Sequence, residues 1–140
     1  MSFDVLNDVN WLAIVVGAVA WWILGAIWYA PPLFGNAWMR SAGIQIREGQ
    51  RPGVATYVVP LLAYFVATIA AAMLARATGS TTFGDGIVLG LVLGVGFGVT
   101  LYWVESTFGQ RPRPSTWFGI TAVYQLLGVL IATVIVTIWR

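Results

Sequence analysis

Cysteine, histidine and lysine are all absent from this 140-residue sequence, and only 9% of its residues are charged. Without cysteine the chain has no disulfide, no thiolate nucleophile and no sulfur-ligated metal. Without histidine it lacks the commonest general base and the commonest metal ligand. The few carboxylates are isolated along the chain, so they assemble no nucleophile–base unit. We therefore expect a protein that is not an enzyme and holds no metal or other cofactor.

Charge of either sign is scarce, whereas apolar residues make up 59% of the chain and the mean hydropathy is +0.85. So few charged side chains cannot cover a soluble fold of this size, so we expect the solvent to be a lipid bilayer. The seven basic residues are scattered arginines. They form no basic run with interleaved aromatic residues, which excludes a nucleic-acid surface.

Four charge-free apolar runs divide the sequence. They cover residues 9–39, 52–75, 86–104 and 114–139. Each run is near or above the roughly 20 residues that a helix needs to cross the hydrocarbon core. Trimmed at prolines and turn residues, the runs predict helices near 10–30, 55–76, 84–106 and 115–139. The predicted fold is an all-α integral membrane protein, with residues 1–140 forming one domain and one bundle of four transmembrane helices.

The arginines are distributed unequally between the two ends of this bundle. The loops 31–54 and 107–114 carry Arg40, Arg47, Arg51, Arg111 and Arg113, whereas the opposite end carries Arg76, Arg140, Asp4, Asp8 and Asp85. Arginine and lysine concentrate in cytoplasmic loops of membrane proteins. We therefore predict that both loops are cytoplasmic and both termini lie outside.

The first loop begins with Pro31 and Pro32, which cannot continue the hydrogen-bond ladder of the first helix. Apolar side chains then recur at helical spacing up to Gly43, where a helix can end. These apolar positions are Leu33, Phe34, Ala37 and Trp38, with Asn36 and Arg40 on other faces. The pattern predicts a short amphipathic helix lying in the headgroup layer.

Residues 10–39, "NWLAIVVGAVAWWILGAIWYAPPLFGNAWM", resemble the opening of a family of small bacterial membrane proteins called domain of unknown function 1761. In that family the first helix runs into a Trp-Tyr-x-Pro-x-x-Phe-Gly turn followed by a tryptophan. The matching residues here are Trp28, Tyr29, Pro31, Phe34, Gly35 and Trp38. The resemblance implies four transmembrane helices in a multi-pass protein of the bacterial cytoplasmic (inner) membrane, and it implies no activity. The motif has two interpretations: a structural elbow, or a lip that binds a lipid headgroup or small molecule.

Glycines at every fourth position mark the third predicted helix, at Gly86, Gly90, Gly94 and Gly98. On a regular helix they form one groove, and close approach across small residues drives helix association in lipid. The second predicted helix has alanines at the same spacing, at Ala63, Ala67, Ala71 and Ala75. Because only a short polar turn separates these helices, we predict that the alanine ridge packs into the glycine groove. The alternatives are an interface between copies of the chain and the lining of a pore.

Glu105 and Gln125 are the polar side chains of greatest interest in the predicted spans. Glu105 shares a face with the glycines near the interface, where it can pair with Arg111, Arg113 or Arg51, or can handle an ion or proton. Thr56 and Tyr57 of the second helix are expected at its level. Gln125 lies deep in the fourth helix beside Tyr124, where it either ties two helices together or contacts a ligand.

The sequence favours a non-enzymatic membrane scaffold or accessory subunit that acts through helix packing. A protomer this small has a limited interior, so we expect a homo-oligomer, which could belong to a larger membrane complex. One alternative is a small channel or carrier for an ion, proton or small solute that uses Glu105 and Gln125. Another is a lipid or hydrophobic-ligand binder that uses the lip from Trp28 to Trp38.

Overall fold

The computed structural model describes residues 2–47 and 49–140, so position 1 of the predicted domain and position 48 of the predicted 31–54 loop lie outside it. The described chain is built from helices. In order they are η1 (Phe3–Asn7), α1 (Trp11–Trp28), η2 (Pro31–Gly35), α2 (Asn36–Ala42), α3 (Ala55–Ala77), α4 (Phe83–Leu93), η3 (Gly94–Val99), α5 (Thr100–Phe108) and α6 (Pro114–Ile138). The π-helical segment η3 joins α4 and α5 into one continuous third span.

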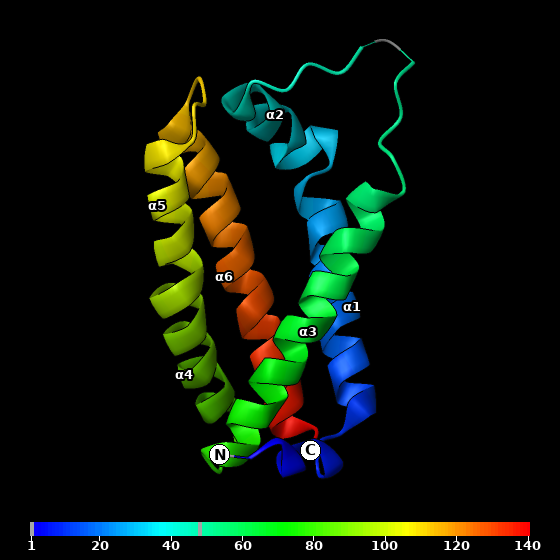
Figure 1. The fold of residues 1–140 in the computed structure, drawn as a ribbon, viewed down its shortest axis with the longest axis vertical. Helices are drawn as coiled ribbons and strands as arrows, with labels where there is room; N and C mark the ends of the chain where they lie inside the picture. The colour runs from blue at the N-terminus through cyan, green and yellow to red at the C-terminus, as the bar shows by residue number, and fades with distance from the viewer. Residues whose placement is uncertain (1, 48) are drawn as a thin grey trace.

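Four helices within the described residues are long and apolar enough to cross a membrane: α1, α3, the span formed by α4, η3 and α5, and α6. Their ends lie within two residues of the predicted boundaries. This confirms the predicted all-α class with four membrane-type helices. Both termini lie at one end of the elongated molecule, and α2 lies at the other end (Figure 1).

Local side-chain chemistry explains where the helices begin and end. Asn10 caps α1 by accepting hydrogen bonds from the backbone N–H groups of Leu12 and Ala13. The Thr82 hydroxyl and the Asp85 carboxylate form a reciprocal capping box at the start of α4. Gly43 ends α2 with a φ of 73°, a left-handed conformation that glycine adopts without steric cost.

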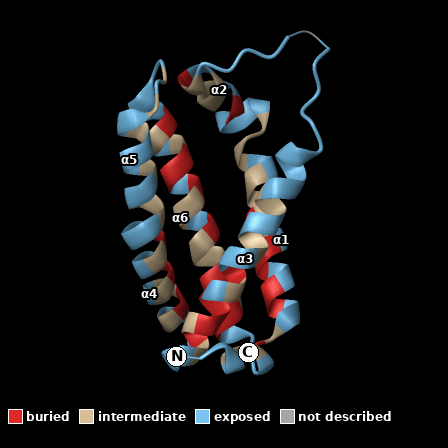
Figure 2. Cartoon of the chain, in the orientation of Figure 1, coloured by how far each residue is buried: buried red, intermediate tan, exposed pale blue. Residues whose placement is uncertain are grey.

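Helix α6 occupies the centre of the bundle. It packs against α1, α3, the whole third span and α2, whereas α3 and α4 scarcely touch each other. Buried residues accordingly gather along α6 and on the halves of α1 and α3 near the termini (Figure 2). The arrangement makes the last span the common partner of the other three.

The prediction that the glycine groove receives the alanine ridge of the second span is wrong. Gly86, Gly90 and Gly94 instead face α6, and a side-chain carbon built on Gly86 would lie 2.8 Å from the Cα atom of Val134. Gly98 has no neighbour there within 4 Å. Gly98 lies within η3, whose i→i+5 pattern departs from the regular helical wheel used for the prediction.

The four alanines of α3 divide between two environments. Ala71 and Ala75 are buried in the core formed by α1, α3 and α6, whereas Ala63 and Ala67 are exposed. The short turn between α3 and α4 keeps only the adjoining ends of these helices together. Because α3 leans toward α1 beyond that turn, its exposed alanines meet no glycine (Figure 1).

Small residues on α1 and α6 bring those two helices together. Gly17 of α1 lies against the Cα of Ala132 and against Thr68 of α3. Gly128 of α6 receives the indole of Trp21, and any side chain at this position would overlap the ring. A glycine on each helix therefore creates room for the partner helix or for its largest side chain.

Candidate functional site

The residues of the Trp-Tyr-x-Pro-x-x-Phe-Gly motif fold the chain back onto α6. Trp28 donates its indole N–H to the carbonyl oxygen of Ile120, at 3.1 Å, and its ring packs against Phe34 with 4.4 Å between centroids. The Tyr29 ring meets Trp38 and Tyr124 edge to face, at 5.2 and 5.1 Å. The aromatic members of the motif are thus engaged within the protein.

The chain folds back so sharply after α1 that position 35 must be glycine. A side-chain carbon on Gly35 would overlap the carbonyl oxygen of Tyr29. Pro31 and Pro32 end the α1 ladder, and Leu33 has a non-helical backbone conformation that turns the chain toward α2. We call the segment from Trp28 to Trp38 the elbow. Its geometry favours the structural interpretation of the motif.

Helix α2 forms where the sequence predicts a short helix, and it packs on the bundle. Trp38 donates its indole N–H to the Thr121 hydroxyl of α6, at 3.1 Å. Ser41 is fully buried and donates to the carbonyl oxygen of Trp38. The backbone N–H of Arg113 donates to the carbonyl oxygen of Ser41, at 3.2 Å. These bonds fasten α2 both to α6 and to the loop between α5 and α6.

A cluster of aromatic and hydroxyl groups connects α1, α3 and α6 next to the elbow. Trp21 and Tyr64 stack in parallel with 4.4 Å between ring centroids. The Tyr124 hydroxyl lies 2.8 Å from the Tyr64 hydroxyl and 3.4 Å from the carbonyl oxygen of Trp21. Tyr124, predicted as a candidate ligand contact, is buried and bonded to its neighbours. This cluster ties three spans together.

Burial also affects Tyr29, which lies just beyond the end of α1 beside this cluster. Its pKa is raised far above the usual value of a phenol, because burial disfavours the charged phenolate. Tyr29 therefore stays neutral across the physiological pH range, and the contacts that the structure shows for its side chain are those of its ring with Trp38 and Tyr124.

Gln125 joins the third and fourth spans. Its side-chain N–H donates to the Tyr102 hydroxyl of α5, at 3.0 Å. The Tyr102 ring in turn meets Trp117 edge to face at 6.0 Å. Of the two interpretations of Gln125, the structure supports the tie between helices.

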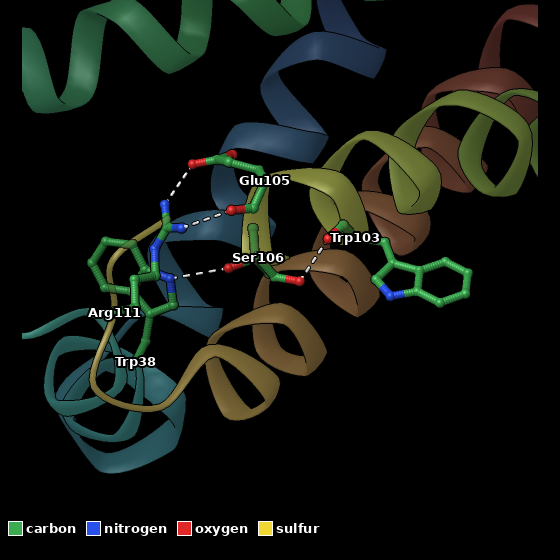
Figure 3. Close-up of polar contacts among 6 residues, drawn as sticks. Trp38, Trp103, Glu105, Ser106 and Arg111 are labelled. Carbon is green, nitrogen blue, oxygen red and sulfur yellow. Dashed lines mark hydrogen bonds and ion pairs between the residues drawn. The ribbon is translucent and has the colours of Figure 1, made fainter. Parts of the chain in front are cut away.

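Glu105 forms an ion pair with Arg111, one of the three partners considered from the sequence, with 2.5 Å between the charged atoms (Figure 3). The Arg111 guanidinium also lies over the Trp117 ring, 3.5 Å from its centroid, and is 18% exposed, whereas the Glu105 side chain is 51% exposed. The pair and the ring close the turn between α5 and α6.

Thr56 and Tyr57, expected at the level of Glu105, do not join this group. Thr56 is exposed, and the carbonyl oxygen of Tyr57 accepts the indole N–H of Trp22 at 2.9 Å. The prediction assumed that α3 pairs with the third span. Because α3 pairs with α1, Tyr57 lies with Trp22.

The hollows near these groups are apolar. One, of about 200 Å³, is lined by residues of α1, α3, α6 and the third span, including Trp21, Ala67 and Phe97. Another, of about 220 Å³, lies between α1 and α3. The indole N–H of Trp21 is buried without a hydrogen-bond partner in the described structure. Within the described residues, histidine, cysteine and carboxylate side chains form no group of three that could hold a metal ion.

Two partners in this region were not singled out from the sequence. Tyr102 accepts the hydrogen bond of Gln125, and Trp117 lies under the Arg111 guanidinium. Depth along the helices would not have paired Tyr102 with Gln125, because Tyr102 lies six residues before the end of α5 and Gln125 lies eleven residues after the start of α6.

Comparison with known proteins agrees with the motif and with the helical architecture. Residues 12–137 match the family described as "Protein of unknown function (DUF1761)". The chain shows no significant match to a curated protein or to a solved structure. Since the match covers most of the chain, the protein belongs to the DUF1761 family.

Proposed function

We propose that this protein is a non-enzymatic membrane scaffold or accessory subunit that works by associating with other spans, beginning with copies of itself. The third span carries this proposal. Only 11% of its most apolar stretch is buried within the protomer, against 28% to 39% for the other spans. Gly96 lies on its uncovered side, exposed and with no neighbour within 4 Å. Exposed glycine in a membrane helix allows another helix to approach closely.

The engaged polar groups support a packing role over ion transport. Tyr124, Gln125 and Glu105 each bond to a side chain of the same protomer. Polar groups that line a transport path need free coordination sites for the solute. A flux assay in liposomes with the wild type and Glu105→Gln tests this point: proton or ion flux that depends on Glu105 would favour a channel or carrier instead.

Oligomeric state is the direct test of the scaffold proposal. The full chain in lipid nanodiscs is expected to form a dimer or larger oligomer by native mass spectrometry. Gly96→Leu should shift it to monomer, because the new side chain blocks close approach. Gly119→Leu on α6 is the matched control, since Gly119 is also exposed with no neighbour within 4 Å. A monomeric wild type, or equal effects of both variants, would contradict the proposal.

We also infer that the α2 end faces the cytoplasm of a bacterial cell and that the termini face outward, because the arginines concentrate at the α2 end. The chain has no native cysteine, so single-cysteine variants report accessibility without background. Ser2→Cys should react with an impermeant maleimide in intact cells, whereas Gln50→Cys should react only after lysis. The reverse pattern would invert the orientation.

A further inference from the structure

Two exposed arginines at the α2 end come from segments whose backbones are bonded together. Arg40 lies in the last turn of α2, one residue before Ser41. Arg113 is the residue whose N–H bonds to the Ser41 carbonyl oxygen. The ring of Pro112 lies against Gly43 at the end of α2. This double fastening holds the two arginines on one rigid part of the surface.

A third arginine at the α2 end, Arg111, already has its charge neutralised within the protein. Arg111 is paired with Glu105 and covered by Trp117. The guanidinium groups of Arg40 and Arg113, by contrast, make no hydrogen bond or ion pair with the described residues. By sequence, the α2 end carries five arginines and two glutamates, so its net charge is positive. As far as the described residues are concerned, two guanidinium groups are therefore available to an anion from outside the chain.

Exposed apolar side chains flank these arginines and place them at the bilayer surface. Leu33, Ile44 and Ile46 around α2 are about half exposed, and Phe108 at the end of α5 is 82% exposed. Such side chains are stable when they enter the acyl region of a bilayer, whereas guanidinium groups remain at the headgroup level. In a bilayer this arrangement would place the arginines at the level of the lipid phosphates.

We propose that Arg40 and Arg113 form a binding site for the phosphate group of an anionic phospholipid at the α2 end of the bundle. Each guanidinium presents a planar set of N–H donors that matches two phosphate oxygens. The negative net charge of the lipid adds attraction that a zwitterionic lipid lacks. The site differs from the aromatic elbow, whose Trp28 and Trp38 N–H groups are already bonded to α6. It goes beyond the scaffold role and does not depend on oligomerisation.

The test measures lipid binding to the full chain in a neutral detergent by native mass spectrometry. The probes are dioctanoyl phosphatidylglycerol, dioctanoyl phosphatidylcholine and inorganic phosphate. The wild type should prefer phosphatidylglycerol. Arg40→Gln and Arg113→Gln should each weaken that binding about fivefold, and the double variant about 25-fold. Arg76→Gln, which removes the same charge at the opposite end, should leave it within about twofold.

Three outcomes would overturn the proposal. One is equal binding of both lipids, and another is an equal loss in Arg76→Gln, which would indicate a diffuse effect of net charge. A third is displacement of the lipid by inorganic phosphate at comparable concentration, which would indicate a site for the free ion. The double lysine variant of Arg40 and Arg113 keeps the charge but loses the planar donors, so binding as strong as that of the wild type would also contradict the geometry. Unfolding temperatures without lipid confirm that each variant is folded.

Discussion

The two halves of the third span hold to the same neighbour by different means. In α4, the glycines remove side chains so that α6 approaches closely, and Gly86 lies nearly against the Val134 backbone. In α5, the contacts with α6 and its preceding loop are made by long polar and aromatic side chains, with Tyr102 bonded to Gln125 and Glu105 paired with Arg111. The π-helical η3 separates the two halves.

Glycines therefore have two different roles within the third span. In lipid the hydrophobic effect gives helices little reason to associate, so close contact and interhelical hydrogen bonds provide the adhesion. Gly86, Gly90 and Gly94 provide close contact inside the protomer, whereas Gly96 faces no atom within 4 Å. A substitution of each kind therefore separates packing within the protomer from packing between protomers.

The largest effect is expected for Gly86→Leu. The new side chain would collide with the α6 backbone at Val134, so the free energy of unfolding should fall by about 3 kcal/mol. Unfolding by dodecyl sulfate in mixed micelles, followed by tryptophan fluorescence, measures it. Gly96→Leu is the matched control and should keep the protomer stable. If both variants lose the same stability, the two halves do not differ as described.

Alanine at two of the glycines that face α6 compares two parts of the same contact. Gly86→Ala should cost about 2 kcal/mol, because a backbone atom of α6 must shift. Gly94→Ala should cost about 0.5 kcal/mol, because its near neighbour is the flexible end of Leu126. The same unfolding assay ranks them. An equal cost at both positions would mean that the α6 backbone shifts as easily as the Leu126 side chain.

The polar half should respond to removal of its interhelical hydrogen bond. Gln125→Leu and Tyr102→Phe should each lower the free energy of unfolding by about 1 kcal/mol. Because both remove the same bond, the double variant should lose about as much as either single variant. Additive losses in this double-mutant cycle would show that the two side chains act independently.

The smallest effect is expected for Glu105→Gln. The pair with Arg111 is half exposed at the carboxylate, and such pairs contribute about 0.5 kcal/mol. The difference between wild type and variant should shrink at 1 M salt, where screening is strong. Unfolding at low and high salt measures it. A loss that does not change with salt would identify a contribution other than charge.

Span limits and helix ends could be predicted because they depend on local chemistry. Pro31 stops α1, Gly43 stops α2, and apolar length sets each span, so the boundaries agree within two residues. The family resemblance also rested on a local feature, the elbow. There the Tyr29 carbonyl oxygen leaves no room for a side chain at Gly35.

Which helix packs against which could not be predicted as well, because it depends on the tilt of whole helices relative to one another. The glycines correctly indicated a close helix contact, but the partner surface on α6 consists of Leu126, Leu130, Thr133 and Val134, which carry no small-residue pattern. The alanines of α3 suggested a complementary ridge, and only Ala71 and Ala75 enter the core. The register change in η3 could not be read from a regular helical wheel either.

The central position of α6 has a consequence for biosynthesis. Because α6 follows the other three spans along the sequence, the polar face formed by Thr121, Tyr124 and Gln125 reaches the membrane after them. Until then α1 and α3 can pack extensively against each other. The third span still exposes the surface that it later buries against α6. We therefore expect the protomer to assemble late, when the α1–α3 pair and the third span pack against the newest segment. A chain that is cut before residue 114 would hold three spans without the helix that contacts all of them.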